Sequence, residues 1–377
     1  MIKQKKIIGT FVFLILIYGF FFISLFLPKK QFSENENRYL QQFPEFGYQN
    51  LLSGKFGNDF ETYLADQFVE RDKWILLKTY SLIALGKTDI NGVYLGKDDY
   101  LLEAHNGVDA TLANENSRRL LSFVQKYQSI VGKDRVHALI APTSTSVLSD
   151  KLPLFAPVYD EYSYLNQLAQ KLGSDVFIDV RDILEEHKDE YIYYRTDHHW
   201  TTLGAYYSYI ELSEQLGIEP YKLEDFDVEC VSDQFAGTIY SKINYGTMLD
   251  SMYRYQLNSD ISYQVFYEES EEYQDTLYVD SRLDTKDQYS YYLDGNHSIV
   301  QIDSSVKNGK TLLLIKDSYA HCFAPFLANH YEKIIMIDLR YYKQSIERLV
   351  EESNVTDILL LYNINQFVTD RNLLYLK

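Results

Sequence analysis

The sequence predicts an α/β protein whose parallel sheet is covered by helices on both faces. Three observations carry this prediction. Short apolar runs typical of buried strands alternate with helical patterns over much of the chain. The length of 377 residues suits one large α/β domain or two smaller ones. The composition, 46% hydrophobic and 24% charged, is that of a folded chain rather than a collagen-like, disordered or disulfide-rich one.

The charge balance excludes one class of function. The chain has 36 Lys and Arg against 54 Asp and Glu, a formal net charge of −18. A protein that binds nucleic acid through its phosphates needs a basic surface, so we do not expect nucleic acid as a partner. The two cysteines, Cys230 and Cys322, form no metal-binding pattern. Their spacing permits one disulfide but does not require it.

The first predicted element is an uncharged apolar segment from Ile7 to Leu27. As a helix, it would span about 30 Å of hydrocarbon. The run is longer than the apolar part of a cleaved signal peptide, and no A-x-A-like cleavage site follows it. We therefore expect residues 1–30 to form a cytoplasmic tail and a single transmembrane signal anchor, with the catalytic domain extracytoplasmic. A buried core helix is the alternative. Lysines flank the run on both sides: Lys3, Lys5, Lys6, Lys29 and Lys30.

Residues 31–100 are expected to form a helical N-terminal region that packs on the main domain. Phe60–Leu85 places apolar residues near a period of 3.6, which predicts one helix that ends at the turn Gly86-Lys87. Asn91–Glu103 contains two short β-like runs around Gly96-Lys97-Asp98-Asp99, which is typical of a hairpin.

Residues 101–377 are expected to form the α/β domain, interrupted by a β-rich insertion at about 220–305. Strands that alternate with helices predict right-handed crossovers and a parallel sheet. One long helix should begin at Thr201 or Thr202 and stop at Gly217. The predicted strands are 136–144, 175–180, 311–316, 333–339 and 357–363; the predicted helices are 117–131, 164–173, 182–190, 201–217, 317–330 and 345–353.

Asp197 and His199 form the first candidate motif, within the segment RTDHHW (195–200). In an extended segment, residues two apart project from the same face of the chain. The carboxylate could then bind imidazole Nδ1 and fix the tautomer whose Nε2 accepts a proton. By itself, an Asp-x-His pair is as often a hydrogen-bonded surface pair.

Ser318 belongs to the second candidate motif, KDSY (316–319), at a predicted junction between strand and helix. Open α/β sheets bind ligands at the carboxyl ends of their strands, and a helix N-terminus can stabilise an oxyanion. A serine hydroxyl is a poor nucleophile without a base. A lone serine here would usually be a helix N-cap, but the two motifs together predict a Ser-His-Asp triad.

These motifs resemble the DHHW protein family. The family belongs to the wider set of SGNH-hydrolase-like proteins, which includes the alginate acetylation proteins of bacterial exopolysaccharide machinery. The resemblance covers nearly the whole chain after residue 30 and implies an SGNH-like, flavodoxin-like sheet. The segments that carry it are RTDHHWTTLGAY (195–206), KDSYAHCFAPFL (316–327), IDLRYY (337–342), SENENRYLQQFPEF (33–46), FETYLADQFVERD (60–72), NGVYLGKDDYLLE (91–103) and FAGTIYSK (235–242).

The resemblance implies Ser318 as nucleophile, His199 as general base and Asp197 as the residue that orients the base. Lys316 stands where the wider set has glycine, which puts close approach of the backbone in doubt. Stabilisation of an oxyanion is expected from the backbone N–H groups of Ser318 and Tyr319. Other residues expected to bind substrate or the oxyanion are Asn363, Asn365, His198 and Arg340, with a structural salt bridge as the alternative for Arg340.

The resemblance implies O-acetylation of an envelope or secreted polysaccharide through an acyl-serine, with the acyl group supplied by a membrane-bound O-acyltransferase. Two alternatives remain: a polysaccharide acetyl-esterase with the same triad, and a non-catalytic scaffold that binds glycan in an export complex. No cofactor is expected. A zinc site is the competing chemistry, but adjacent His198 and His199 would project to opposite sides of an extended segment, and HExxH and CxxC spacings are absent.

Overall fold

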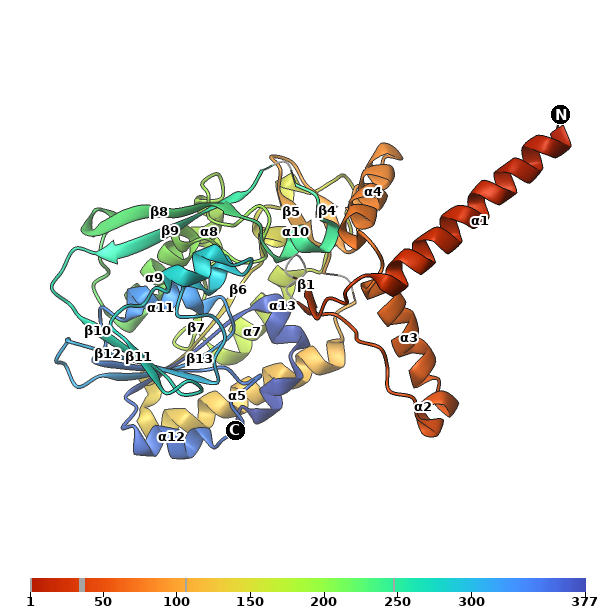
Figure 1. Ribbon diagram of the computed structural model, residues 1–377. Coiled ribbons are helices and arrows are strands. Elements are labelled where there is room, and N and C mark those ends of the chain that lie inside the picture. Colours follow the sequence, from red (N-terminus) through yellow and green to blue (C-terminus); the bar gives the residue numbers. More distant parts are fainter. Residues whose placement is uncertain (1, 34–37, 106, 247) are drawn as a thin grey trace. The chain divides into compact units, whose positions relative to one another are not determined.

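The computed structural model describes residues 2–33, 38–105, 107–246 and 248–377 (Figure 1). Residues 34–37 of the motif predicted at 33–46 lie outside the described residues. The chain divides into two units. The first comprises Met1–Lys87 and Ser241–Tyr245, and the second comprises Thr88–Tyr240 and Gly246–Lys377.

The first unit is mainly helical. Among the residues that the structure describes, no helix combines the length and the apolar character needed to cross a membrane. The anchor predicted at Ile7–Leu27 is therefore not supported, and the side chains at positions 7, 16 and 25 of that run lie outside the described set. The elements are α1 (Ile2–Phe26), β1 (Phe32–Ser33), β2 (Arg38–Tyr39), α2 (Tyr48–Leu52), α3 (Lys55–Asp66) and α4 (Arg71–Ala84).

The single helix predicted over Phe60–Leu85 is wrong, because α3 and α4 are separate helices. Glu70, immediately before α4, has a left-handed backbone with φ of 52°. A helix cannot continue through that conformation, since every helical residue needs a negative φ. The apolar spacing continues across the break and therefore could not reveal it.

The second unit is built on an eight-stranded sheet in the order β11-β10-β12-β14-β13-β15-β6-β7. The five strands from β14 to β7 are parallel, and the other three pair in antiparallel fashion. The strands are β6 (Val136–Ala141), β7 (Phe177–Ile178), β10 (Tyr263–Tyr267), β11 (Glu272–Gln274), β12 (Ile299–Ser304), β13 (Thr311–Lys316), β14 (Lys333–Ile337) and β15 (Asp357–Asn363).

The prediction of an entirely parallel sheet is wrong at the β11 edge. The segment predicted as an insertion at about 220–305 supplies the three antiparallel strands there. Its short strands follow one another without the long crossovers that parallel pairing requires. The same segment also contains a separate antiparallel pair, β8 (Phe226–Phe235) with β9 (Asp250–Leu257).

Each face of the main sheet has its own apolar core, because successive residues of a strand point to opposite faces. In β13, Leu312 and Leu314 belong to one core, whereas Leu313 and Ile315 belong to the other. Helices cover both faces, as predicted (Figure 1). The first core is completed by α8 (Arg181–Glu186), α9 (Thr202–Leu216) and α11 (Ala320–Leu327), and the second by α5 (Ala110–Val131), α7 (Glu161–Leu172), α12 (Ile346–Glu352) and α13 (Ile364–Thr369).

Local signals in the sequence mark several elements of this unit correctly. The predicted hairpin is present as β4 (Val93–Leu95) and β5 (Leu101–Glu103), extended by β3 (Asp89–Ile90). The Thr201 side chain accepts a hydrogen bond from the Gly204 N–H and thereby caps α9. Gly217 ends α9 with a φ of 62°, a conformation that costs glycine little.

The strand order places a ligand crevice between β13 and β15. If β13 is counted first, the parallel strands β14-β13-β15-β6-β7 have the order 2-1-3-4-5, which is that of flavodoxin-like sheets. The chain leaves β13 toward one side to form β14 and later forms β15 on the other side. The connections therefore diverge at the carboxyl ends of β13 and β15, where sheets of this kind bind ligands.

We predict that Leu360→Ala lowers the free energy of unfolding by about 2–5 kcal/mol, since truncating a buried leucine leaves a cavity in the core. Leu360 lies in β15 and is only 1% exposed. Leu154→Ala is the matched control, because Leu154 is 89% exposed. Its effect should stay within about 0.5 kcal/mol. Chemical denaturation of the full chain measures both; equal effects would contradict the assigned core.

Candidate active site

Ser318 lies in the turn between β13 and α11, at the carboxyl edge of the sheet. The preceding Asp317 fixes this turn. Its carboxylate accepts hydrogen bonds from the Tyr319 N–H at 2.8 Å and from the backbone and side-chain nitrogens of Asn363, both at 2.7 Å. Because Asn363 ends the neighbouring strand β15, the turn that carries Ser318 is tied to two adjacent strands.

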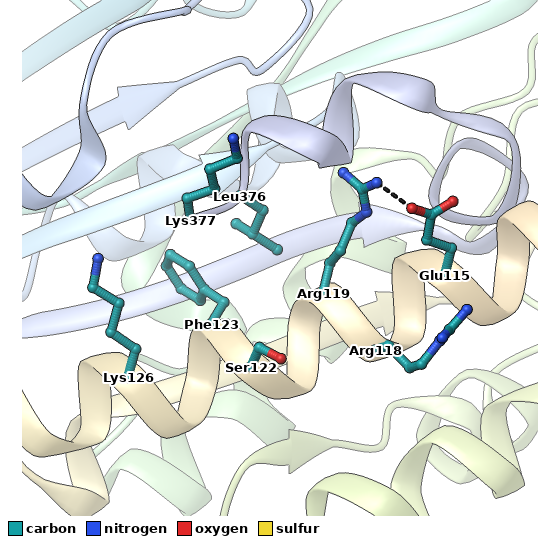
Figure 2. A pocket seen from close by; sticks show the side chains of 8 residues that line it. All are labelled: Glu115, Arg118, Arg119, Ser122, Phe123, Lys126, Leu376 and Lys377. Atoms are coloured by element: carbon teal, nitrogen blue, oxygen red, sulfur yellow. Dashed lines mark hydrogen bonds and ion pairs between the residues drawn. The ribbon is translucent and has the colours of Figure 1, made fainter.

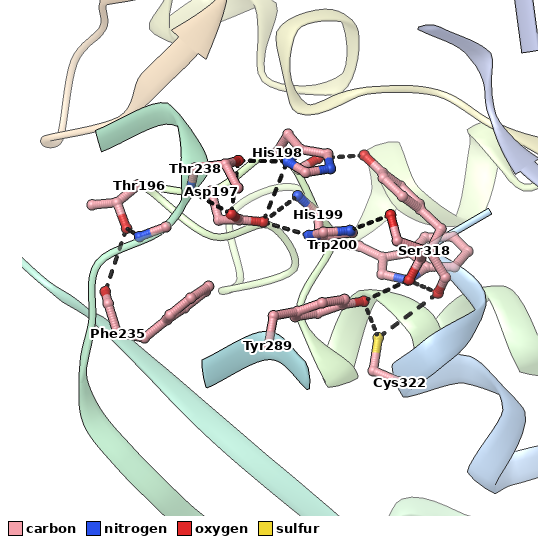
Figure 3. Close-up of polar contacts among 12 residues, drawn as sticks. Thr196, Asp197, His198, His199, Trp200, Phe235, Thr238, Tyr289, Ser318 and Cys322 are labelled. Carbon is pink, nitrogen blue, oxygen red and sulfur yellow. Dashed lines mark hydrogen bonds and ion pairs between the residues drawn. The ribbon is translucent and has the colours of Figure 1, made fainter. Parts of the chain in front are cut away.

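A continuous hydrogen-bonded chain joins Ser318 to the Asp-x-His motif (Figure 3). The distance from Ser318 Oγ to His199 Nε2 is 2.7 Å, and His199 Nδ1 lies 2.5 Å from Asp197 Oδ1. The structure therefore brings together the three residues predicted to form the triad, although 119 positions separate Ser318 from His199.

The loop that carries Asp197 and His199 is bent, not extended as predicted. Tyr193 and Trp200 form an antiparallel bridge on either side of it, and residues 195–199 are bends. The rings of His198 and His199 therefore lie close together, with centroids 3.8 Å apart, instead of projecting to opposite sides. Asp197 reaches His199 because the turn brings them together, not because of strand alternation.

Thr238 holds the far oxygen of Asp197. Its backbone N–H and its hydroxyl donate to Asp197 Oδ2 at 2.7 and 3.0 Å. Thr238 is the first residue of α10 (Thr238–Ile243), and Gly237 precedes it. A Cβ at position 237 would lie 2.2 Å from the Cβ of Asp197, so only glycine lets the chain pass there. The motif predicted at 235–242 contains both residues, but the sequence gave no role to either.

Asp250 fixes the same loop from β9. Its carboxylate accepts hydrogen bonds from the Thr196 N–H at 2.7 Å, the Thr196 hydroxyl at 2.5 Å, the Arg195 N–H at 2.8 Å and the Tyr191 hydroxyl at 2.5 Å. Burial raises the pKa of Asp250, while these donors oppose the shift. Sequence analysis missed this residue, since nothing near Asp250 marks it as a partner of the motif.

The electrostatics suit His199 to act as a base. Burial opposes the ionisation of Asp197, but His198, His199 and Thr238 together hold the pKa of its carboxyl below the ordinary value. Burial lowers the pKa of His199 to about 4, helped by His198 and opposed by Asp197. The imidazole is therefore neutral at physiological pH, and its Nε2 can accept the proton of Ser318.

The residues predicted to bind the oxyanion or substrate differ in their availability. The Tyr319 N–H is already donated to Asp317, and its hydroxyl donates to the His198 carbonyl at 2.6 Å. Asn363 uses its side chain on Asp317 and on the Gln366 N–H. These hydrogen bonds remove Tyr319 and Asn363 from the expected role.

Other predicted donors remain available. The Ser318 N–H has no acceptor among the described residues and precedes the N-terminus of α11, so it can receive an oxyanion. The His198 side chain is 31% exposed and shares Nδ1 with the Thr238 hydroxyl at 2.6 Å. Asn365 is half-buried in α13.

Arg340 and Lys316 form an ion-pair cluster. Arg340 donates to Asp338 at 2.9 Å and to Asn296 at 2.7 Å, which is the salt-bridge alternative. The buried Lys316 Nζ lies 2.7 Å from His321 Nε2 and 3.5 Å from Asp338. The lysine at the glycine position therefore directs its side chain into this cluster.

Asp197, His198 and His199 are also the residues of a conceivable metal site, since each offers a ligand atom and these atoms lie within 4.8 Å of one another. An oxygen and two imidazole nitrogens suit zinc. However, an ion bound through His199 Nδ1 would take the place of the hydrogen bond to Asp197. The observed geometry is that of a relay to Ser318.

The two cysteines are free thiols. Cys322, one turn after Ser318, is buried, and burial raises the pKa of its thiol to about 12. Cys230 is exposed. The disulfide that the sequence permitted is not formed.

A separate depression of about 460 Å³ lies between α5 and the last residues of the chain (Figure 2). Arg119 and Lys126 point into it, but each is paired with a carboxylate, Glu115 and Glu347 respectively. None of the predicted site residues lines this depression. The carboxyl edge of the sheet is therefore the better candidate for an active site.

Comparisons with known proteins agree with this fold. A DHHW family protein from Eubacterium siraeum is 25% identical with a TM-score of 0.65, covering 76% of this chain and 95% of its own. Bacillus cereus PatB1 with a sulfonyl adduct is 20% identical with a TM-score of 0.60, covering 76% and 98%. The O-acetyltransferase domain of Pseudomonas putida AlgJ is 13% identical with a TM-score of 0.45, covering 74% and 93%.

The sequence comparisons concern the second unit. A search of curated proteins finds no match. The model of the family described as DHHW protein matches residues 100–337, which is more than half of the chain and includes both candidate motifs. The protein therefore belongs to the DHHW protein family.

Proposed function

We propose that the protein is an extracytoplasmic serine O-acyltransferase, with acetyl as the acyl group, that modifies a cell-envelope or secreted polysaccharide. The observation that carries this proposal is the unbroken chain of hydrogen bonds from Asp197 through His199 to Ser318. Serine has little reactivity without a base, and this arrangement supplies the base and the carboxylate that orients it.

In the first step, Ser318 Oγ attacks the acyl carbonyl while His199 Nε2 takes its proton. The new bond joins Oγ to the carbonyl carbon, and the carbonyl oxygen becomes an oxyanion that the Ser318 N–H can receive. The tetrahedral intermediate then collapses. The bond to the donor breaks, and His199 returns the proton to the departing oxygen.

In the second step, a sugar hydroxyl attacks the acyl-serine. His199, neutral again, takes the proton of that hydroxyl, and the imidazolium gives it to Ser318 Oγ as the ester bond to the enzyme breaks. The acetyl group is then an ester of the sugar. Transfer rather than hydrolysis requires that water be kept from the acyl-serine.

The substrate and the compartment follow from the family resemblance. Relatives among the alginate acetylation proteins suggest an exported polysaccharide as acceptor, and such a polymer is modified outside the cytoplasm. Activated acetyl groups are made inside the cell. The proposal therefore includes a membrane-bound O-acyltransferase as the partner that delivers the acetyl group to Ser318.

The test compares the full chain with Ser318→Ala, using 4-nitrophenyl acetate as donor. We expect at least about a 10³-fold loss of acetyl release in the variant, as for serine enzymes that lose their nucleophile. Ser129→Ala is the matched control, since Ser129 is exposed. Equal rates for the wild type and Ser318→Ala would end the proposal. With hexasaccharides added, acetylated sugar in the mass spectrum supports transfer, whereas free acetate alone supports the esterase.

The pH dependence follows from the pKa of His199. Only neutral His199 can accept the Ser318 proton, and its pKa is lowered to about 4. We therefore expect the rate of acetyl release to rise as the pH increases through about 4 and to be constant from about pH 6 to 7. A midpoint near the ordinary histidine value of about 6.5 would contradict the buried, neutral base.

Gly237→Ala is expected to reduce acetyl release by about 10²-fold or more, because the added methyl group would displace Asp197 and misalign His199. Gly57→Ala is the matched control, as no atom lies within 4 Å of a Cβ at that helical position. Circular dichroism verifies that both variants are folded. Unchanged activity of a folded Gly237→Ala would show that Asp197 does not need its observed position.

A further inference from the structure

Tyr289 is the aromatic residue that covers His199. It lies in the short helix η5 (Gln288–Tyr291), within the segment predicted as an insertion. Its ring stacks on the imidazole with centroids 3.8 Å apart and planes inclined by 11°. Tyr289 is 4% exposed, so the contact is shielded from solvent. The base of the relay therefore has one whole face against a tyrosine.

The same tyrosine also contacts the backbone of the nucleophile. Its hydroxyl donates to the Ser318 carbonyl at 3.2 Å and lies 3.3 Å from Cys322 Sγ (Figure 3). Thus Tyr289 touches His199 with its face and the Ser318 turn with its hydroxyl. Any movement that separated His199 from Ser318 would disturb at least one of these contacts.

Other tyrosines hold the ring of Tyr289 in place. Tyr194 meets it nearly edge-on, with centroids 6.3 Å apart at 88°, and Tyr292 does so at 5.5 Å and 63°. Both are fully buried. Edge-to-face contacts of this kind favour one orientation of the ring. The stack on His199 is therefore a fixed feature of the core.

The stack matters most when His199 carries a proton. Each step of acyl transfer forms an imidazolium, and burial makes that cation costly, as the lowered pKa of His199 indicates. The face of an aromatic ring attracts a cation, most strongly where water is excluded. Asp197 stabilises the imidazolium through Nδ1, and Tyr289 covers its face.

We propose that Tyr289 is a positioning residue that aligns His199 with Ser318 and stabilises the imidazolium through the stacked ring. This rests on the proposed function only in taking Ser318 as the nucleophile. The titratable and charged groups around His199 are Asp197 and His198 on its own loop, Tyr289 on η5, Tyr319 and His321 on the α11 side, and Arg340 after β14.

The test measures sulfonylation of Ser318 in the full chain by phenylmethanesulfonyl fluoride. In this reaction the Ser318 Oγ–S bond forms, the S–F bond breaks, fluoride leaves, and His199 takes the hydroxyl proton. The rate of adduct formation, followed by intact mass, reports nucleophile activation without any acyl donor or sugar. Tyr289→Phe keeps the stack and loses the hydroxyl, whereas Tyr289→Leu keeps an apolar side chain and loses the stack.

We expect Tyr289→Phe to remain within about 2-fold of the wild type, with the same midpoint in its pH profile. Tyr289→Leu should lower the plateau rate by about 2- to 30-fold, the range of a cation–π contact, and move the midpoint to lower pH. Equal rates and midpoints for the two variants would overturn the proposal. A loss in Tyr289→Phe as large as that in Tyr289→Leu would also overturn it, since the hydroxyl would then be responsible.

A measurement on the wild type covers the case in which Tyr289→Leu fails to fold. With histidine labelled at ¹³Cε1, the ring current of Tyr289 should shift the His199 resonance upfield, and His199→Gln identifies that resonance. An unshifted resonance would refute the stack in solution. If sulfonylation depends on Tyr289 as expected but no sugar is acetylated, the proposed function fails while this inference stands.

Discussion

The contact between His199 and Ser318 depends on fixing two loops that belong to distant parts of the chain. A relay hydrogen bond works only if both loops keep their positions to within a fraction of an ångström. Buried carboxylates provide this constraint on each side. Asp317 ties the turn of Ser318 to β15, and Asp250 ties the loop of His199 to β9. The backbone donors that these acids collect define where the reactive atoms lie.

These acids are satisfied by different means, and the difference matters for charge. Burial raises the pKa of Asp317 to about 6 and also raises that of Asp250, so both are held mainly by hydrogen bonds from neutral groups. Asp197 has two histidines and Thr238 around it, which keep its pKa below the ordinary value in spite of burial. The charged acid is thus the one that faces the base, where an imidazolium must be stabilised.

The segment 220–305 contributes much of the site although it breaks the regular α/β pattern. Thr238 and Gly237 surround Asp197, Asp250 fixes the bent loop, and Tyr289 stacks on His199. The parallel part of the sheet supplies only Ser318 and its turn. A conserved architecture at the switch point is thereby combined with a wall of tyrosines and a charged relay that come from elsewhere in the chain.

The sequence by itself determined the alternation of strands and helices, the cap and stop of α9, and the residue types of the relay, because these depend on local spacing and chemistry. Only the tertiary structure decided the antiparallel edge, the break before α4, and which expected donors are already used, as for Tyr319. It also decided the roles of Asp250 and Tyr289. Their partners lie tens of positions away in the chain, and no local pattern records which distant groups a buried side chain will meet when the sheet closes.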